Sequence, residues 1–353
     1  MSEVDLDELA QRVESADQTL AQQARDRQAR LLRPAGAFGR LEEVAAWAAT
    51  VQGSCPPRPF ARPRVVVLAA DHGVARRGVS ANPPETTARL VRSIVAGGGL
   101  VNVLAARAGA SVRVVDLAVD ADLEDLPVIG HKVRRGSDDL AVGPALSRDE
   151  ADRALRAGMA IVDEEVDAGA DLLVAADLGV GATTPAATLT ALLTGSDVAP
   201  MVGRGSGIDD RTWMIKCAAV RDSARRGREL LPDPIGLLAE AGGVDLAATT
   251  GFLVQAALRR TPVLLDGVVS TAAALLAHRI SFRSRGWWLA GHRSPDPAHE
   301  RALERLQLEP VLDFGIRLGT GTGALLALPV VQAAIAVLAD LEPVDLSAAT
   351  GPA

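Results

Sequence analysis

Short β-branched and apolar runs alternate with amphipathic helical patterns from Arg64 onward. Apolar runs of this length, bounded by turn residues, are typical of strands buried in a parallel sheet. We expect strands at Val65–Ala70, Ala110–Val119, Leu172–Ala176, Val198–Val202, Thr261–Leu265 and Trp288–Gly291. Helical patterns lie between most of these strands, which predicts an α/β fold with a doubly wound, mostly parallel sheet and helices on both faces.

The two ends of the chain have a different pattern from the middle. Residues 1–30 and 40–51 are predicted to be amphipathic helices, and a proline-rich break follows them. The segment 323–341 is predicted to be an apolar helix that packs back onto the N-terminal helices. We therefore expect two domains: a large α/β nucleotide-binding domain over residues 60–320, and a small helical domain formed by residues 1–59 with 321–353.

Three stretches run from an apolar strand-like segment into a Gly- and Thr-rich turn and then into a helix. They are Asp171–Leu189, Ala199–Lys216 and Pro310–Leu328. A glycine turn that opens a helix presents backbone N–H groups and the positive end of the helix dipole, which favour an anion such as phosphate. Three of them predict a site at the carboxyl ends of parallel strands.

Composition narrows the possible functions of this 353-residue chain. Hydrophobic residues make up 48%, but aromatic residues make up 3% and tyrosine is absent, so a base-stacking nucleic-acid surface is not expected. The net charge of −7 also argues against a nucleic-acid partner. We expect no membrane span, since no apolar run approaches the length needed, and a cytoplasmic location. No metal site or cofactor is predicted, because histidine and cysteine spacing gives no ligand set.

Two residue clusters follow predicted strands directly. Asp71 and His72 come immediately after the first strand, where a doubly wound sheet places site residues, although His72 could simply order the loop by hydrogen bonding. After the third strand, Gly179 and Gly181 allow close backbone approach, and Thr183 could either bind phosphate or cap the next helix.

Two further clusters lie later in the chain. Gly203 opens a glycine-rich turn, Asp209 or Asp210 is a natural N-cap, and Lys216 could reach a phosphate or be solvated. His292, Arg293 and Ser294 form the last cluster, in which Arg293 could hold a carboxylate with two hydrogen bonds. A proline-rich surface turn is the competing interpretation of that cluster.

The order of these motifs resembles the nicotinate-nucleotide–dimethylbenzimidazole phosphoribosyltransferase family. The resemblance extends from about Arg33 to Leu341 and is carried by the ordered blocks ADHGVARRGVSANPPETTA, LGVGATTPAA, GSGIDD with Lys216, PVLLDGVVSTAAALL, GHRSPDPAH and RLGTGTGALLALP. It implies a homodimer that transfers phosphoribose from nicotinate mononucleotide to 5,6-dimethylbenzimidazole. The products would be nicotinate and α-ribazole 5′-phosphate, a step in cobalamin biosynthesis.

The resemblance also implies roles for individual residues. Those implied to hold the phosphate and ribose are Gly179, Gly181, Thr183, Gly203 and Lys216. Asp177 matches an acidic family position near the nucleotide. Ser80 and Leu318 would line the benzimidazole pocket, and His292, Arg293 and Ser294 would lie near the nicotinate carboxylate.

This chain departs from the family pattern at the position of the catalytic base. The family has Glu in an Arg-Leu-Gly-Glu-Gly-Thr-Gly run, and here that position is Thr320, which does not accept a proton at neutral pH. Other departures are Asn82 for Tyr, Arg89 for Gln, Ala182 for Asn and the additional charge of Arg204. Asp71 or Glu85 is the expected substitute base.

Three hypotheses follow from these departures. In the first, the chain remains a transferase that uses another carboxylate. In the second, it is a catalytically impaired paralogue that binds nucleotide or assembles with an active subunit as a hetero-oligomer. In the third, it is a transferase for a different acceptor base.

Overall fold

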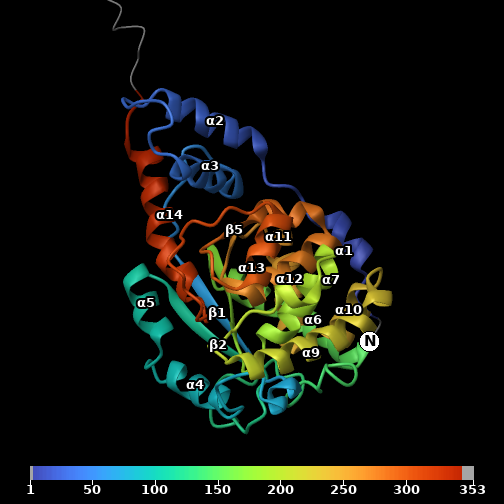
Figure 1. Ribbon diagram of the computed structural model, residues 1–353. Coiled ribbons are helices and arrows are strands. Elements are labelled where there is room, and N and C mark those ends of the chain that lie inside the picture. The colour runs from blue at the N-terminus through green and yellow to red at the C-terminus, as the bar shows by residue number, and fades with distance from the viewer. Residues whose placement is uncertain (1–2, 344–353) are drawn as a thin grey trace, which may run out of the picture.

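A parallel sheet of five strands forms the centre of this computed structural model, which describes residues 3–343 (Figure 1). The strand order is β2-β1-β3-β4-β5, and every neighbouring pair is parallel. The predicted doubly wound α/β fold is therefore confirmed. The strands are β1 (Pro63–Ala70), β2 (Ser111–Ala118), β3 (Leu172–Leu178), β4 (Val263–Leu265) and β5 (Trp288–Ala290).

One of the six predicted strands is wrong. Residues 198–202 form the short helix α8 (Val198–Met201) instead of a strand. Pro200 lacks the N–H that a sheet ladder needs, and Val202 packs in a small apolar cluster with Val220 of the next helix. The third glycine turn is also not preceded by a strand, because Leu312 forms only an isolated bridge to His292. Of the three predicted strand-turn-helix stretches, only the first, β3 to α7, has that structure.

Helices account for most of the remaining described chain. The α-helices of its first half are α1 (Leu6–Arg12), α2 (Gln18–Ala29), α3 (Arg40–Gln52), α4 (Thr86–Val95), α5 (Leu100–Ala108) and α6 (Arg148–Asp167). Those of the second half are α7 (Thr183–Thr194), α8, α9 (Asp210–Gly227), α10 (Pro234–Ala241), α11 (Val244–Leu258), α12 (Gly267–Ile280), α13 (Pro297–Leu306) and α14 (Thr322–Asp340). Three short 3₁₀ segments are η1 (Gly73–Arg77), η2 (Arg228–Leu230) and η3 (Phe282–Trp287).

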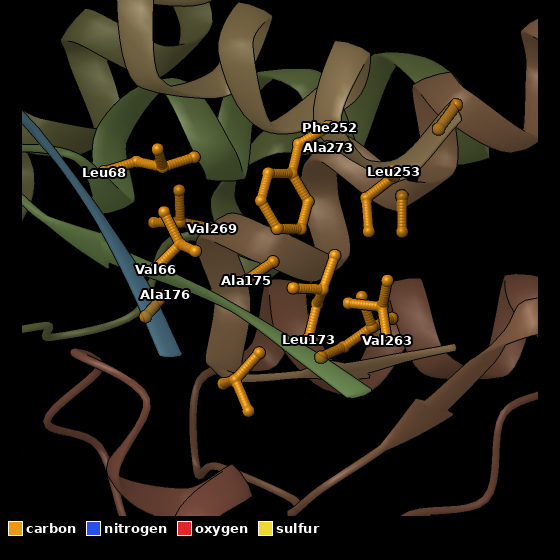
Figure 2. Close-up of a cluster of buried hydrophobic side chains, with 14 of the residues drawn as sticks. Val66, Leu68, Leu173, Ala175, Ala176, Phe252, Leu253, Val263, Val269 and Ala273 are labelled. Carbon is orange, nitrogen blue, oxygen red and sulfur yellow. The ribbon is translucent and has the colours of Figure 1, made fainter. Parts of the chain in front are cut away.

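Aliphatic side chains join the sheet to the helices that cover one face. Figure 2 shows Val66 and Leu68 of β1 and Leu173 of β3 with Phe252 of α11. All four side chains are fully buried. Helices α6 and α11 approach closely because Gly158 faces α11, where a Cβ would lie 1.8 Å from the carbonyl oxygen of Ala248. Helices α4 and α5 contact β2.

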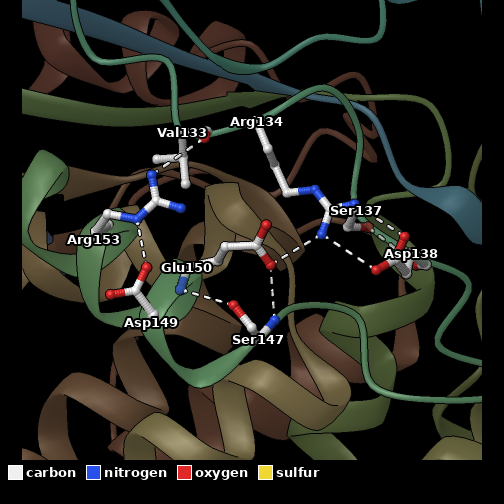
Figure 3. Close-up of polar contacts among 8 residues, drawn as sticks. All are labelled: Val133, Arg134, Ser137, Asp138, Ser147, Asp149, Glu150 and Arg153. Carbon is white, nitrogen blue, oxygen red and sulfur yellow. Dashed lines mark hydrogen bonds and ion pairs between the residues drawn. The ribbon is translucent and has the colours of Figure 1, made fainter.

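The long helix α6 begins with a capping box. The Ser147 hydroxyl accepts a hydrogen bond from the Glu150 N–H at 3.2 Å, and the Glu150 carboxylate accepts one from the Ser147 N–H at 2.8 Å. Arg134 donates to Glu150 and to Asp138, so the preceding loop is attached to the start of the helix (Figure 3).

The N-terminal region and the last helix lie together, as predicted. Arg27 of α2 donates from Nε to the carbonyl oxygen of Leu338 at 2.7 Å, and α14 packs against α3 (Figure 1). The prediction of a single helix over residues 1–30 is wrong, because the structure has two helices, α1 and α2, with a non-helical segment from Val13 to Asp17 between them. Asp17 then caps α2 by accepting from the Thr19 N–H. The proposed domain boundaries stay a prediction, and residues 344–353 of the small domain lie outside the described chain.

Within residues 3–343, two segments are long and apolar enough to cross a membrane, contrary to the expectation of no membrane span. The first, Thr86–Ala108, comprises α4 and α5, whose helices are separated by the turn at Gly97–Gly99. The second is α14, which is 56% buried inside the molecule against α3 and α5. Length and composition of this kind also fit core helices of a soluble protein, so they are weak evidence for a membrane span.

Candidate functional site

A cavity of about 490 Å³ opens beyond the carboxyl ends of β3, β4 and β5. This is the edge at which open parallel sheets bind their ligands. Its polar lining comprises Asp177, Thr183, Arg204, His292, Ser294, Asp296 and Arg317. The remaining lining is apolar or glycine: Val202, Gly203, Gly205, Trp213, Gly267, Val268, Val269, Pro295, Pro297, Leu318 and Gly319.

The loop that carries Thr320 lies against Asp177 at the end of β3. The Thr320 N–H donates to the carbonyl oxygen of Asp177 at 3.1 Å, and a Cβ on Gly319 would lie 3.4 Å from the Asp177 carboxylate. Thr320 has φ of 57°, and its hydroxyl donates to the carbonyl oxygen of Gly319 at 2.7 Å. Thr320 is not among the residues that line the cavity, whereas Asp177 is.

A second carboxylate, Asp266, holds the start of α14. It follows β4 directly, is fully buried, and accepts hydrogen bonds from the N–H groups of Gly321 and Ala324, each at 2.9 Å. His292 follows β5, and its Nε2 lies 3.5 Å from Asp266. Gly323 packs on the His292 ring so closely that a Cβ would lie 2.0 Å from Cδ2. Asp266 therefore joins the 319–324 loop to the ends of two strands.

Lys216 provides a buried cation behind two residues that line the other end of the cavity, Thr183 and Gly203. Its side chain is 1% exposed, and Nζ donates to the Thr183 hydroxyl at 2.7 Å and to the Gly203 carbonyl oxygen at 3.1 Å. The solvated alternative for Lys216 is therefore wrong. Burial lowers the pKa of Lys216, and nearby Asp296 partly offsets this effect.

The start of α7 also faces this end of the cavity. No side chain caps α7, so the hydroxyl of Thr183 does not satisfy an amide of its own helix. The alternative in which this threonine only caps the helix is wrong. The positive end of the helix dipole and the ammonium group of Lys216 together favour an anion here.

Ser294 and His299 form a buried pair beside His292. The backbone N–H of Ser294 donates to His299 Nδ1 at 3.1 Å, and the Ser294 hydroxyl lies 2.8 Å from the same nitrogen. Burial, followed by the charges of His292 and Arg293, lowers the pKa of His299 to about 3. His299 is therefore neutral with its proton on Nε2, and Ser294 is oriented by an acceptor at Nδ1.

Asp177 has a strongly perturbed carboxyl group. Burial raises its pKa to about 8, and the neighbouring carboxylates of Asp266 and Asp245 add to the effect. Part of the residue nevertheless reaches the cavity. A carboxylate of this kind exchanges a proton near neutral pH, which is a property of catalytic acids and bases.

Several predicted residues lie outside the cavity lining. Asp71 is buried and accepts from the Asp120 N–H at 2.9 Å, while Glu85 and Arg89 are exposed on or beside α4. Arg293 forms ion pairs with Glu300 and Asp313. The other predicted residues that do not line it are Ser80, Gly179, Gly181, Thr320 and Lys216, the last of which lies behind the lining residues Thr183 and Gly203.

Some of these outlying residues still support the site. The Ser80 hydroxyl lies 3.2 Å from that of Ser206, in the turn that contributes Gly203 and Gly205 to the cavity. Gly179 allows close packing, because a Cβ there would lie 2.1 Å from the Ala70 carbonyl oxygen. His72 lies 3.1 Å from Asp245, which agrees with its ordering role.

Trp213, Asp296 and Arg317 line the cavity although the sequence assigned them no role, and Asp266, which is buried behind the lining, was also missed. Asp266 follows a strand exactly as Asp71 does, so the same positional rule identifies it. Asp296 lies two residues after Ser294, and its carboxylate fills the space beside Gly203. Trp213 and Arg317 carry no such signal, since the packing of α9 and of the loop before α14 brings them to the cavity.

The cavity thus combines a cationic end, a carboxylate with a raised pKa and an apolar wall. It can hold an anionic group, a flat apolar ring and a reacting centre between them. In the part of the chain that the structure describes, no group of three or more His, Cys, Asp or Glu side chains is arranged to hold a metal ion.

Known proteins of one enzyme family resemble this chain in sequence and in structure. A family model described as "Phosphoribosyltransferase" matches residues 13–347. The nicotinate-nucleotide–dimethylbenzimidazole phosphoribosyltransferase of Mycolicibacterium paratuberculosis is 58% identical over 93% of this chain and 94% of its own length. The protein of the same name from Mycobacterium tuberculosis is 55% identical over 93% and 91%. The crystal structure of CobT from Thermus thermophilus is 40% identical, with a TM-score of 0.89, and covers 95% of this chain and 100% of its own.

Proposed function

This chain belongs to the nicotinate-nucleotide–dimethylbenzimidazole phosphoribosyltransferase family, and we propose that its cavity transfers phosphoribose from nicotinate mononucleotide to a benzimidazole-type base. With 5,6-dimethylbenzimidazole the products are nicotinate and α-ribazole 5′-phosphate, a step in cobalamin biosynthesis. The observation that carries the proposal is that the half-buried residue Asp177, whose carboxyl group has a raised pKa, lines a cavity that also has a cationic end and an apolar wall.

The nucleotide phosphate is assigned to the cationic end. Lys216 is the buried positive charge there, and Thr183 and Gly203 are its hydrogen-bond partners. Gly179 and Gly181 support this end by allowing the loop before α7 to pack closely. Holding the phosphate positions the anomeric carbon, and such positioning contributes a large part of catalysis in two-substrate reactions.

The acceptor base is assigned to the apolar wall that includes Leu318, Trp213 and Val268. Ser80 lies at the rim through its contact with Ser206, and exposed Arg89 is farther along the same segment. His292 and Ser294 are assigned to the nicotinate side of the cavity. Arg293 supports them indirectly, through its ion pairs with Glu300 and Asp313.

The reaction needs one proton acceptor. One ring nitrogen of the benzimidazole attacks the anomeric carbon, the bond to nicotinate breaks, and its electron pair neutralises the pyridinium nitrogen. The other benzimidazole nitrogen then loses a proton. We assign that proton to Asp177, because Thr320 has no carboxyl group and neither Asp71 nor Glu85 lines the cavity.

We propose a cytoplasmic homodimer. The exposed apolar side chains of α4 and α5, which include Leu90, Leu100 and Val103, support a subunit interface at that face. The alternative is a hetero-oligomer with an active paralogue. In that case this chain would show no transferase activity when it is purified alone. Residues 60–320 and the two terminal segments are proposed as the large and small domains.

The deciding experiment incubates the purified protein with nicotinate mononucleotide and 5,6-dimethylbenzimidazole and follows α-ribazole 5′-phosphate by mass spectrometry. Thr320→Glu is measured beside the wild type. Product from the wild type that disappears in Asp177→Asn supports the proposal. Product from Thr320→Glu alone contradicts it and favours the impaired paralogue. Turnover only with another azole or a phenol identifies a different acceptor.

A further inference from the structure

One carboxylate of the cavity, Asp296, has no role in the transfer described above. The residue is half-buried and lines the cavity beside Gly203, where a Cβ would lie 2.1 Å from Asp296 Oδ2. The other carboxylate of the lining, Asp177, is assigned to the proton transfer. Asp296 is therefore available to bind a part of the substrate that does not react.

The backbone of Asp296 is fixed by its neighbours in the sequence. A proline lies on each side, at Pro295 and Pro297, and a residue that precedes a proline favours an extended conformation. Asp296 has φ of −80° and ψ of 123°, which agrees with this rule, and Pro297 begins α13. Asp296 Oδ1 caps that helix by accepting from the Ala298 N–H at 3.1 Å. The carboxylate is thus held in position before a ligand binds.

The second carboxylate oxygen, Oδ2, is left free to bind a ligand. Within residues 3–343, no hydrogen bond of ordinary geometry is donated to Oδ2, and no basic side chain forms an ion pair with Asp296. Oδ2 is also not enclosed by protein: the enclosed polar atoms without a partner include both ring nitrogens of His292 but not this oxygen. A carboxylate oxygen accepts hydrogen bonds, so its partner in a ligand is a group with a proton to donate.

The location of Asp296 indicates which donor it meets. Gly203 belongs to the end assigned to the phosphate, since its carbonyl oxygen accepts from Lys216 at 3.1 Å. Ser294 belongs to the nicotinate side, and its hydroxyl accepts from the Asp296 N–H at 3.4 Å. In nicotinate mononucleotide the ribose joins the phosphate to the ring, so a residue between these two ends meets the sugar. The donors of the sugar are its C2 and C3 hydroxyl groups.

We propose that Asp296 binds the ribose hydroxyl groups and makes the cavity specific for a ribonucleotide. An acidic side chain binds the ribose 2′ hydroxyl in the same way in dinucleotide-binding folds. The phosphate and the nicotinate carboxylate are excluded as partners, because both are negatively charged acceptors. The inference rests on the proposed function, from which it takes the phosphate and nicotinate ends of the cavity.

The charge state of Asp296 is consistent with this role. Burial raises the pKa of its carboxyl group, and the positive charge of Lys216 partly offsets that effect. Hydrogen bonds donated by hydroxyl groups favour the charged form of a carboxylate. Binding of the ribose would therefore stabilise the form of Asp296 that accepts both hydrogen bonds.

Nicotinate mononucleotide and its 2′-deoxy and 3′-deoxy analogues test this assignment by calorimetry, which needs no turnover. The wild type should bind at least one deoxy analogue about tenfold to hundredfold more weakly, because a hydrogen bond to a charged acceptor is lost. The ratio of the two affinities is the measure, since a change of charge near Lys216 alters phosphate binding equally for all three compounds. Equal binding of the three compounds to the wild type would overturn the inference.

Variants assign the preference to Asp296. Asp296→Ser removes Oδ2 and keeps a hydroxyl that can cap α13, and Asp296→Asn keeps both the cap and the size of the side chain. In each variant the preference for the ribonucleotide should fall about tenfold. Asp17→Ser is the matched control, because exposed Asp17 caps α2 by accepting from the Thr19 N–H at 2.9 Å, and its preference should equal that of the wild type. An unchanged preference in both Asp296 variants would overturn the inference.

The same measurements separate this inference from the proposed transfer. A preference for the ribonucleotide that depends on Asp296, without formation of α-ribazole 5′-phosphate, would support the role of Asp296 and contradict the transfer. Product formation without such a preference would overturn the inference alone. A wild type that binds none of the three compounds would overturn both.

Discussion

The main-chain N–H of Thr320 donates a hydrogen bond to the carbonyl oxygen of Asp177 at 3.1 Å. This bond attaches the glycine-rich loop before α14 to the end of β3, although the two residues are 143 positions apart in the sequence. It places the residue that replaces the family's glutamate next to the carboxylate with the raised pKa.

Replacing Thr320 by Gly should stabilise the protein. Thr320 has φ of 57°, a left-handed conformation that a β-branched side chain strongly disfavours. Removal of that side chain should raise the free energy of unfolding by about 1 kcal/mol, measured by urea denaturation. Thr322→Gly is the control, because buried Thr322 begins α14 and donates to the Gly319 carbonyl at 2.9 Å, so its loss should destabilise. A less stable Thr320→Gly protein would contradict the argument.

Asp177→Asn should lower kcat by about 10²–10⁴, the usual contribution of a positioned base. The pH dependence of wild-type kcat/KM gives a sharper test. Because the pKa of Asp177 is raised to about 8, the carboxyl group is mostly protonated at lower pH and cannot accept a proton. The kcat/KM of the wild type should therefore rise about tenfold per pH unit up to pH ~8 and then level off. A profile that is flat between pH 6 and 8 would assign the base elsewhere.

Lys216→Met should weaken the binding of nicotinate mononucleotide by about tenfold to hundredfold, as measured by calorimetry, since a charged donor to the phosphate is lost. The chain has one other lysine, Lys132, which pairs with Asp116 of β2 at 2.7 Å. Lys132→Met is thus a matched control that should alter stability and leave nucleotide affinity unchanged. Equal effects of the two variants on affinity would show that Lys216 is not part of the phosphate site.

Gly323→Ala should destabilise the protein by about 1–3 kcal/mol, because a Cβ would overlap the ring of His292, which is 1% exposed and enclosed. Gly143→Ala is the control: a Cβ there meets nothing within 4 Å, so the change should be within about 0.5 kcal/mol. Thermal unfolding of both variants measures the difference. A neutral Gly323→Ala variant would show that the start of α14 can move away from His292.

The strands that were predicted correctly carry long β-branched or apolar runs, such as Val65–Ala70, whose burial follows from composition. The prediction failed for residues 198–202, where an apolar run of similar character contains Pro200 and packs on α9. Periodicity could not separate these cases, because a short apolar run suits either a buried strand or a buried helical turn.

Most candidate residues that are adjacent to strands could also be predicted from the sequence. His292 and Asp177 lie at strand ends and line the cavity, as expected. Trp213 of α9 and Asp296, which precedes α13, reach the same cavity because of tertiary packing. The same limit applied to Lys216, for which burial could not be read from a single position in an amphipathic helix.

By itself, the sequence determined the alternation of strands and helices, the family, and the absence of a carboxyl group at position 320, because these are properties of local pattern and residue identity. Only the tertiary structure decided that Asp177 rather than Asp71 or Glu85 reaches the cavity, and that Lys216 is buried beside Thr183. Both outcomes depend on which loops meet at the carboxyl ends of β3, β4 and β5. These loop contacts join residues that are far apart in the sequence. The pKa of a carboxylate depends on the neighbours that such contacts place beside it.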